Sequence, residues 1–188
     1  CPNLSTGGYQ FHSVREFIPV QSLHTMVAVL EDLGVERAFN FITENLGVTT
    51  LVRREVIGGQ VKSDVNLAPL SLGGVTHGVT NLEMAAAYSA FVNKGIYNKP
   101  YTYTKVVAYD GTVLLEHEAD PVYAMSEQTA YLINDLLQGV VRSGTGTPAQ
   151  LSNMAVAGKT GTTSDDVDRW FVGYTPYYLA AVWTGFDT

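Results

Sequence analysis

The chain has 188 residues, of which 46% are hydrophobic and 15% charged, a composition that fits one globular domain or most of one. Its formal net charge is −7 and its only adjacent basic pair is Arg53-Arg54, which argues against a nucleic-acid-binding protein. Cys1 is the single cysteine and no stretch approaches 18 consecutive apolar residues, so an intramolecular disulfide and a membrane-spanning helix are excluded.

The chain opens on Cys-Pro-Asn without an initiator Met. We therefore expect it to be a piece of a longer protein, called here the parent protein, with any targeting signal or membrane anchor lying upstream.

The first third of the chain has a helical pattern. Apolar residues recur at helical spacing over residues 13–33, and because Pro19 interrupts the run, two helices are predicted, the second ending at Gly34. Another helix is predicted over 36–46, with Gly47 at its end.

The middle of the chain is less regular. Residues 49–74 contain two Gly pairs and Pro69 but little periodicity, which predicts mostly loop. Thr80 and Glu83 have the spacing of a capping box, and they predict a helix over 82–92.

The pattern then changes to strands. Two runs rich in β-branched and aromatic residues, 103–109 and 112–116, are separated by Asp110-Gly111, which predicts a hairpin with a two-residue turn. A helix is predicted over 126–141 with Ser126 as its N-cap. Three strands are predicted over 155–162, 170–174 and 179–184, and the whole order indicates an α+β fold with a largely antiparallel sheet.

The sequence Gly-Lys-Thr-Gly-Thr-Thr at 158–163 carries the clearest chemical pattern. On a strand, Lys159 supplies positive potential and the hydroxyl of Thr160 is placed to bind a carboxylate. Gly161 has no side chain, so the backbone of a substrate has room to lie along the strand. The N–H of Thr162 is then placed to face a developing oxyanion.

Two other readings of glycine-rich segments fit less well. A phosphate-binding P-loop requires a glycine five residues before Gly158, where the chain has Asn153. Residues 144–149 match the spacing of a dinucleotide fingerprint, but they follow a helix and contain Pro148, which favours a plain glycine-rich turn.

Lys159-Thr160-Gly161 resembles the third signature of penicillin-binding proteins and serine β-lactamases, whose set is S-x-x-K, S-x-N and K-T-G. Segments 168–176 and 180–185 are similar to the strands that follow this signature in class A (bifunctional) penicillin-binding proteins. Segments 71–74, 78–80 and 83–88 resemble the entry of a helix in that family, and 140–146 resemble the stretch ahead of the signature strand. The resemblance extends from about Pro2 to the end and is weakest over 49–69.

The resemblance implies a β-lactamase/transpeptidase-like fold that is incomplete at its N-terminal side. Residues 1–188 would be the C-terminal part of a single transpeptidase domain. The family cross-links peptidoglycan stem peptides through an acyl-serine intermediate and binds β-lactam antibiotics, without a metal or other cofactor. The implied location is the extracytoplasmic face of a bacterial membrane, reached only through an anchor in the parent protein.

Two of the family's signatures are absent or altered. No serine in the chain has a lysine three residues later, so the acylated serine is expected upstream, in the missing N-terminal part of the domain. For the second signature, Ser22 is the expected proton-shuttling residue and His24 stands where the substrate-holding asparagine is expected. An alternative register places Gln21 and Leu23 at these positions, and ordinary helix residues remain a further reading.

The resemblance also distributes roles over the third signature. Lys159 is the expected electrostatic anchor, Thr160 the carboxylate contact, Gly161 the source of clearance and Thr162 one half of the oxyanion hole. Thr163 is a further substrate contact.

Other functions and sites remain open. A degenerate domain would bind cell-wall peptides or partner proteins without turnover, and a β-lactamase or D,D-carboxypeptidase would resolve the acyl-enzyme with water. His12, His77 and His117 show no metal-ligand spacing and are read as surface or loop residues.

Overall fold

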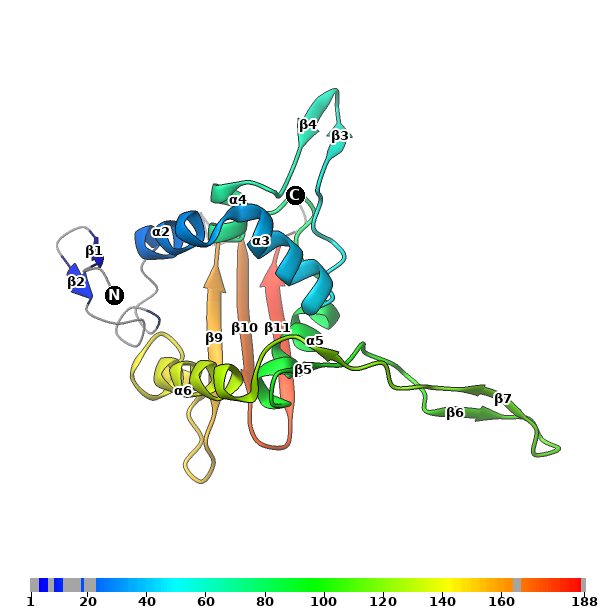
Figure 1. The fold of residues 1–188 in the computed structure, drawn as a ribbon. Helices are drawn as coiled ribbons and strands as arrows, with labels where there is room; N and C mark the ends of the chain where they lie inside the picture. Colours follow the sequence, from blue (N-terminus) through cyan, green and yellow to red (C-terminus); the bar gives the residue numbers. More distant parts are fainter. Residues whose placement is uncertain (1–3, 7–8, 12–17, 19–22, 164–166, 187–188) are drawn as a thin grey trace.

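The computed structural model describes residues 4–6, 9–11, 18, 23–163 and 167–186. At its centre is an antiparallel sheet in the order β11-β10-β9, formed by β9 (Ala157–Thr162), β10 (Asp168–Tyr174) and β11 (Leu179–Gly185) (Figure 1). The three strands predicted at the end of the chain are thus confirmed, and β9, which carries the lysine motif, is an edge strand of this sheet.

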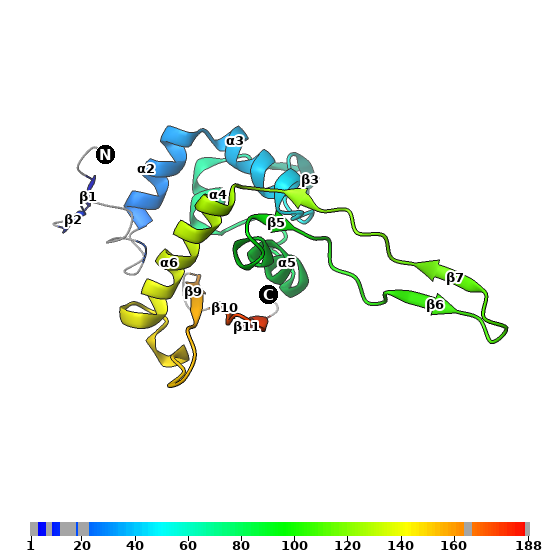
Figure 2. The same ribbon diagram turned by 60° about the horizontal axis from the view of Figure 1, so that its bottom comes forward.

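Two helices pack on one face of the sheet. Helix α5 (Asn81–Val92) contacts β10 and β11, and α6 (Glu127–Ser143) contacts β9 (Figure 2). Leu137 of α6, Ala157 of β9 and Tyr174 of β10 form a buried apolar cluster between these layers. The core therefore supports the strand from the side on which the side chain of Ala157 lies.

Three further helices in the described part of the chain pack against one another, α2 (Leu23–Leu33), α3 (Val35–Asn40) and α4 (Leu67–Leu72). The predicted end at Gly34 is confirmed, because this glycine has a φ of 91° between α2 and α3. The helix predicted over 36–46 is present but changes to a π-helical turn, η1 (Phe41–Asn45), before Gly47. The earlier of the two helices predicted over 13–33 lies largely outside the described residues.

Both predicted helix caps are confirmed. The hydroxyl of Ser126 accepts the N–H of Thr129 at 3.1 Å at the start of α6. At the start of α5, Thr80 and Glu83 form the reciprocal capping box. Glu83 does more than cap its own helix, because its carboxylate also accepts the backbone N–H of Thr49 at 2.7 Å and that of Thr50 at 3.2 Å.

The titration of Glu83 is linked to the stability of this arrangement. Partial burial raises its pKa, but hydrogen bonds from Thr49 and Thr80 outweigh this effect and lower the pKa from 4.5 to about 2. A carboxyl group whose folded-state pKa is depressed stabilises the fold above its unfolded pKa, and this stabilisation is lost as the pH falls from about 4.5 towards 2.

We expect Glu83→Gln to destabilise the parent protein at pH 7 by on the order of 1–2 kcal/mol, after allowance for solvent screening. The difference from wild type should shrink as the pH is lowered through this window. Thermal unfolding at several pH values measures both effects. Glu118→Gln is a control on the projecting arm, and an equal pH dependence in the two variants would contradict the assignment.

The prediction of mostly loop over 49–74 holds for slightly more than half of the segment, but the remaining residues form regular elements that were not predicted. This segment contains a hairpin of β3 (Glu55–Ile57) and β4 (Gln60–Lys62), followed by α4. The hairpin turns at Gly58 and Gly59, whose φ values are 57° and 80°. Strands of three residues are too short to show a clear alternation of polar and apolar side chains, which is why the periodicity failed to reveal them.

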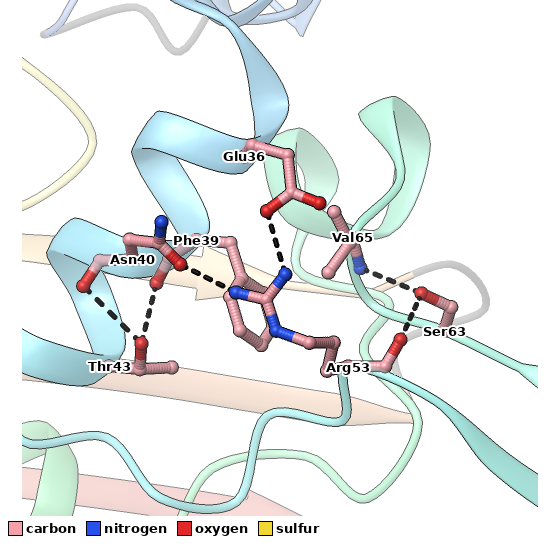
Figure 3. A network of polar contacts seen from close by, with 7 residues as sticks. All are labelled: Glu36, Phe39, Asn40, Thr43, Arg53, Ser63 and Val65. Carbon is pink, nitrogen blue, oxygen red and sulfur yellow. Dashed lines mark hydrogen bonds and ion pairs between the residues drawn. The ribbon is translucent and has the colours of Figure 1, made fainter.

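Arg53 links the base of the β3–β4 hairpin to α3 (Figure 3). Its guanidinium donates to Glu36 Oε2 at 2.7 Å and to Asn40 Oδ1 at 2.6 Å, and it lies 4.8 Å from the ring centroid of Phe39. The carbonyl of Arg53 accepts the hydroxyl of Ser63 at 2.7 Å. Arg53, one of the two adjacent arginines, therefore has a structural role within the fold.

A long arm leaves the body of the molecule after α5 (Figures 1 and 2). At its base, β5 (Ile96–Tyr97) pairs with β8 (Val122–Tyr123), and at its end β6 (Lys105–Val107) pairs with β7 (Val113–Glu116). The predicted hairpin is confirmed, but its two-residue turn is wrong. Ala108 donates to the carbonyl of Thr112 at 2.8 Å, which leaves a three-residue loop ending in Gly111 at a φ of 88°. A further hairpin, β1 (Leu4–Thr6) with β2 (Tyr9–Phe11), lies near the start of the chain.

Candidate functional site

A cavity of about 400 Å³ opens beside β9. Its walls come from the sheet, from α5, from η1 and from the segment between η1 and α5, and they are mainly apolar. The side chains that represent these walls are Ile42, Leu46, Leu51, Leu70, Val79, Tyr88, Phe91, Trp170 and Val172. The motif residues Lys159 to Thr163 line the same cavity, so the pattern found in the sequence borders the space that a ligand or a protein segment would enter.

Strand pairing orients the motif. Lys159 lies opposite Val172, and Gly161 lies opposite Trp170. Thr163 donates its N–H to the carbonyl of Asp168 at 3.0 Å, and antiparallel neighbours alternate between pairs that exchange backbone hydrogen bonds and pairs that do not. The backbone groups of Thr160 and Thr162 therefore point away from β10, towards the outer edge of the sheet.

The ammonium group of Lys159 is held close to the backbone of this edge. Its Nζ donates to the carbonyl oxygen of Thr160 at 2.9 Å. The side chain is partly buried, and burial lowers its pKa from 10.5 to about 8 because an apolar environment disfavours the charged form. The arrangement places positive charge on the wall of a mainly apolar cavity.

Thr160 and Gly161 have further structural partners. The hydroxyl of Thr160 lies 2.7 Å from that of Thr145, which belongs to the connection between α6 and β9. A Cβ atom on Gly161 would lie 3.3 Å from Cβ of Trp170, a tight contact across the two strands. Glycine is therefore favoured here by the cross-strand tryptophan as well as by the space expected for a substrate.

Thr163 belongs to a network at the end of the motif strand. Its hydroxyl donates to Asp168 Oδ2 at 3.2 Å and accepts the Asp168 N–H at 2.9 Å. The other oxygen, Asp168 Oδ1, accepts the indole N–H of Trp183 at 2.9 Å. These bonds give Thr163 a clear part in holding β9, β10 and β11 together, and its expected contact with a substrate stays a prediction.

The structure describes the other residues singled out in the sequence to different extents. Ser22 lies outside the described residues, and for His24 only its place in the first turn of α2 is described. His77 Nε2 lies 2.6 Å from Glu55 Oε2, and the ring of His117 stacks on Tyr101 with 3.8 Å between centroids. Within the described ranges, no group of three or more His, Cys, Asp or Glu side chains is placed to hold a metal ion.

Two features of the site were missed by sequence reasoning. Thr145 was predicted only to lie in a loop. Its distance from Thr160 along the sequence does not predict their contact, because the contact depends on the turn between α6 and β9. The cavity is formed by segments distant in the sequence, including the stretch that lacked periodicity. An apolar residue such as Leu51 or Leu70 in that stretch was the available hint.

Comparison with known proteins gives a consistent result. Residues 6–185 match the family described as "Penicillin binding protein transpeptidase domain". The chain is 40% identical over 188 residues to penicillin-binding protein 1A of Clostridium acetobutylicum, covering 99% of the chain and 22% of that protein. It is 49% identical over 181 residues to penicillin-binding protein 1A of Clostridium botulinum, covering 95% of the chain and 21% of that protein.

A solved structure supports the fold. The D,D-transpeptidase domain of a peptidoglycan glycosyltransferase from Eggerthella lenta superposes with a TM-score of 0.71 at 23% identity, covering 94% of this chain and 49% of that one. The expected β-lactamase/transpeptidase-like fold is thereby confirmed. The chain spans about a fifth of the length of the two curated relatives and about half of the solved chain.

Proposed function

The chain belongs to the transpeptidase domain family of penicillin-binding proteins, and on this premise we propose that residues 1–188 form the C-terminal part of a peptidoglycan D,D-transpeptidase domain. The observation that carries the proposal is the position of Lys159, Thr160 and Gly161 on an edge strand beside a large cavity. This edge is where an extended peptide or a β-lactam has room to lie.

Each motif residue has a part in binding the donor peptide. The ammonium of Lys159 attracts the terminal carboxylate of a D-Ala–D-Ala stem peptide, and the hydroxyl of Thr160 donates a hydrogen bond to it. Gly161 leaves clearance for the peptide backbone. The N–H of Thr162 faces the outer edge of β9 and stabilises the oxyanion that forms on the attacked carbonyl.

The nucleophile comes from another part of the parent protein. A serine hydroxyl of an upstream Ser-x-x-Lys segment attacks the carbonyl carbon between the two D-Ala residues, and D-Ala leaves with a proton on its amine. An amine of a second stem peptide then attacks the acyl-serine, forms the cross-link and returns the proton to serine. A β-lactam is opened by the same serine and remains attached. Residues 1–188 alone therefore perform no acyl transfer.

The apolar cavity supports the placement of this upstream segment. Its walls, represented by Leu46, Tyr88 and Val172, suit the apolar face of a protein segment better than a charged peptide, whereas Lys159 lines the cavity with the other motif residues. A segment seated there would bring its own serine close to this motif. Ser22 and His24 remain proposed as the second signature, on the helical side of the site.

The reaction also suggests where the parent protein works. Peptidoglycan lies outside the cytoplasmic membrane, so this domain would sit on the extracytoplasmic face and be anchored by other parts of the parent. In the described part of the chain, no helix is long and apolar enough to cross a membrane.

The test is a cross-linking assay with the purified parent protein and a stem-peptide substrate. We expect release of D-Ala and formation of cross-linked product, both blocked by penicillin. Release of D-Ala without cross-links would favour a carboxypeptidase, and hydrolysis of penicillin with multiple turnovers would favour a β-lactamase. No reaction and no penicillin adduct would favour a degenerate domain that binds cell-wall peptides without turnover. The presence of His24 where the second signature has asparagine supports that alternative.

A further inference from the structure

The connection between α6 and β9 brings a second threonine to the motif strand. Thr145 Oγ1 lies 2.7 Å from Thr160 Oγ1, a distance typical of a well-formed bond between hydroxyl groups. Residue 145 precedes the motif by more than a dozen positions and has no role in the function proposed above. The contact links the hydroxyl expected to bind a carboxylate to a group outside the strand.

The backbone that presents Thr145 is tightly held. The N–H groups of Gly144 and Gly146, on either side of it, both donate to the carbonyl of Val140, at 3.0 and 3.1 Å. Gly146 is buried, and a Cβ atom there would lie 3.3 Å from Val141 and 3.4 Å from Val140. Gly146 therefore allows a close turn directly after α6.

A second set of bonds fixes the far side of the same turn. The side-chain amide of Gln150 donates to the carbonyls of Val141 and Arg142, each at 2.9 Å, and so caps the last turn of α6. A short 3-10 helix, η2 (Thr147–Ala149), lies between Gly146 and Gln150. With both flanks bound to α6, the position of the Thr145 hydroxyl relative to β9 is set by the helix.

Hydrogen-bond chemistry gives this contact a direction. Each threonine hydroxyl has one hydrogen, so in the pair one group donates and the other accepts. An ionised carboxylate only accepts, and a carboxylate bound at Thr160 therefore takes the hydrogen of Thr160. Thr145 is then the donor to Thr160, and a hydroxyl that accepts a hydrogen bond becomes a stronger donor itself.

We propose that Thr145 is a positioning residue, which orients and polarises the Thr160 hydroxyl towards the carboxylate of the stem peptide or β-lactam. This inference rests on the proposed function of the motif strand. Thr145 acts through Thr160 and does not touch the ligand itself. Its effect is therefore confined to ligands that carry the carboxylate.

The test compares two probes on the parent protein, a penicillin and its methyl ester, by their second-order rates of acylation. Thr145→Val keeps the size of the side chain but removes the hydroxyl. We expect it to lower the rate with the free carboxylate by about fivefold and to leave the rate with the ester within about twofold, as for loss of one hydrogen bond. Thr145→Ser retains the hydroxyl and should restore the preference for the carboxylate.

Thr160→Val and the double variant Thr145→Val/Thr160→Val complete the comparison. Because Thr145 acts through Thr160, the double variant should lose no more carboxylate preference than Thr160→Val alone. Partial unfolding lowers the rates with both probes equally, so the ratio of the two rates reports the positioning role alone.

Equal loss with both probes, or additive losses in the double variant, would overturn this inference while leaving the proposed function intact. Absence of acylation in the wild-type parent would instead refute the proposed function.

Discussion

Replacement of Lys159 by alanine is expected to lower the rate at which penicillin acylates the parent protein by roughly 10- to 100-fold, the worth of a charge-assisted hydrogen bond. The reason is its position, because Nζ lies at the outer edge of β9, 2.9 Å from the carbonyl oxygen of Thr160, where a bound carboxylate is expected. Stopped-flow acylation with a penicillin measures the change. The loss should appear mainly with carboxylate-bearing probes.

Lys159→Arg is the matched variant for this experiment. Burial lowers the pKa of Lys159 to about 8, so the positive charge of the wild type is present below this pH and is lost as the pH rises through it. Arginine keeps its charge over the same range. We expect acylation by the wild type to decline between about pH 7 and 9 more steeply than acylation by Lys159→Arg.

Lys105→Ala removes an exposed lysine of the projecting arm and serves as a control for the loss of one positive charge. Its acylation rate should equal that of the wild type. An unchanged rate in Lys159→Ala would contradict the role of this lysine as the electrostatic anchor.

Replacement of Asp64 by alanine is expected to destabilise the domain by about 3–5 kcal/mol, the range found when one partner of a buried charged network is removed. The Asp64 side chain is only 1% exposed. It accepts the Val52 N–H at 2.7 Å, the Thr76 N–H at 2.8 Å and the Thr76 hydroxyl at 2.7 Å. Alanine would leave these partly buried donors without their acceptor.

Because of the location of Asp64, its replacement is also expected to disturb the wall of the cavity. Its three bonds join the segments that precede the β3–β4 hairpin and follow α4, and Leu51 and Val75 in these segments line the cavity. Asp64→Asn keeps one acceptor oxygen but turns an amide N–H₂ towards donors, so an intermediate loss is expected.

Chemical denaturation of the parent protein measures the free energy of unfolding of both variants. Asp110→Ala is the matched control, because that aspartate also accepts a backbone N–H but lies in the exposed turn of the arm. An Asp64→Ala variant as stable as Asp110→Ala would show that the buried network contributes little.

The elements that were predicted correctly are those with local signals. The capping pair Thr80 and Glu83 marked the start of α5, and Gly34 marked the end of α2. The strand-like runs that form β9, β10 and β11 were also predicted, and each is a continuous segment of six or seven residues. The lysine motif was found because its residues are consecutive.

What could not be predicted depends on contacts between distant segments. The β3–β4 hairpin is fixed by Arg53 reaching back to Glu36 and by Asp64 reaching forward to Thr76. The turn of the arm differs from a two-residue turn by one hydrogen bond, between Ala108 and Thr112, which the dipeptide Asp-Gly does not encode. In the site, the pairing of Thr145 with Thr160 follows from the turn after α6.

We propose that residues 1–188 supply the carboxylate-binding strand of a transpeptidase site while the nucleophile lies elsewhere in the parent protein. The most direct measurement is to label the parent with fluorescent penicillin, digest it and locate the adduct by mass spectrometry. We expect one adduct, on the serine of a Ser-x-x-Lys sequence upstream of residue 1, and no adduct on a separately prepared 1–188 chain. An adduct on any serine within residues 1–188 would contradict it.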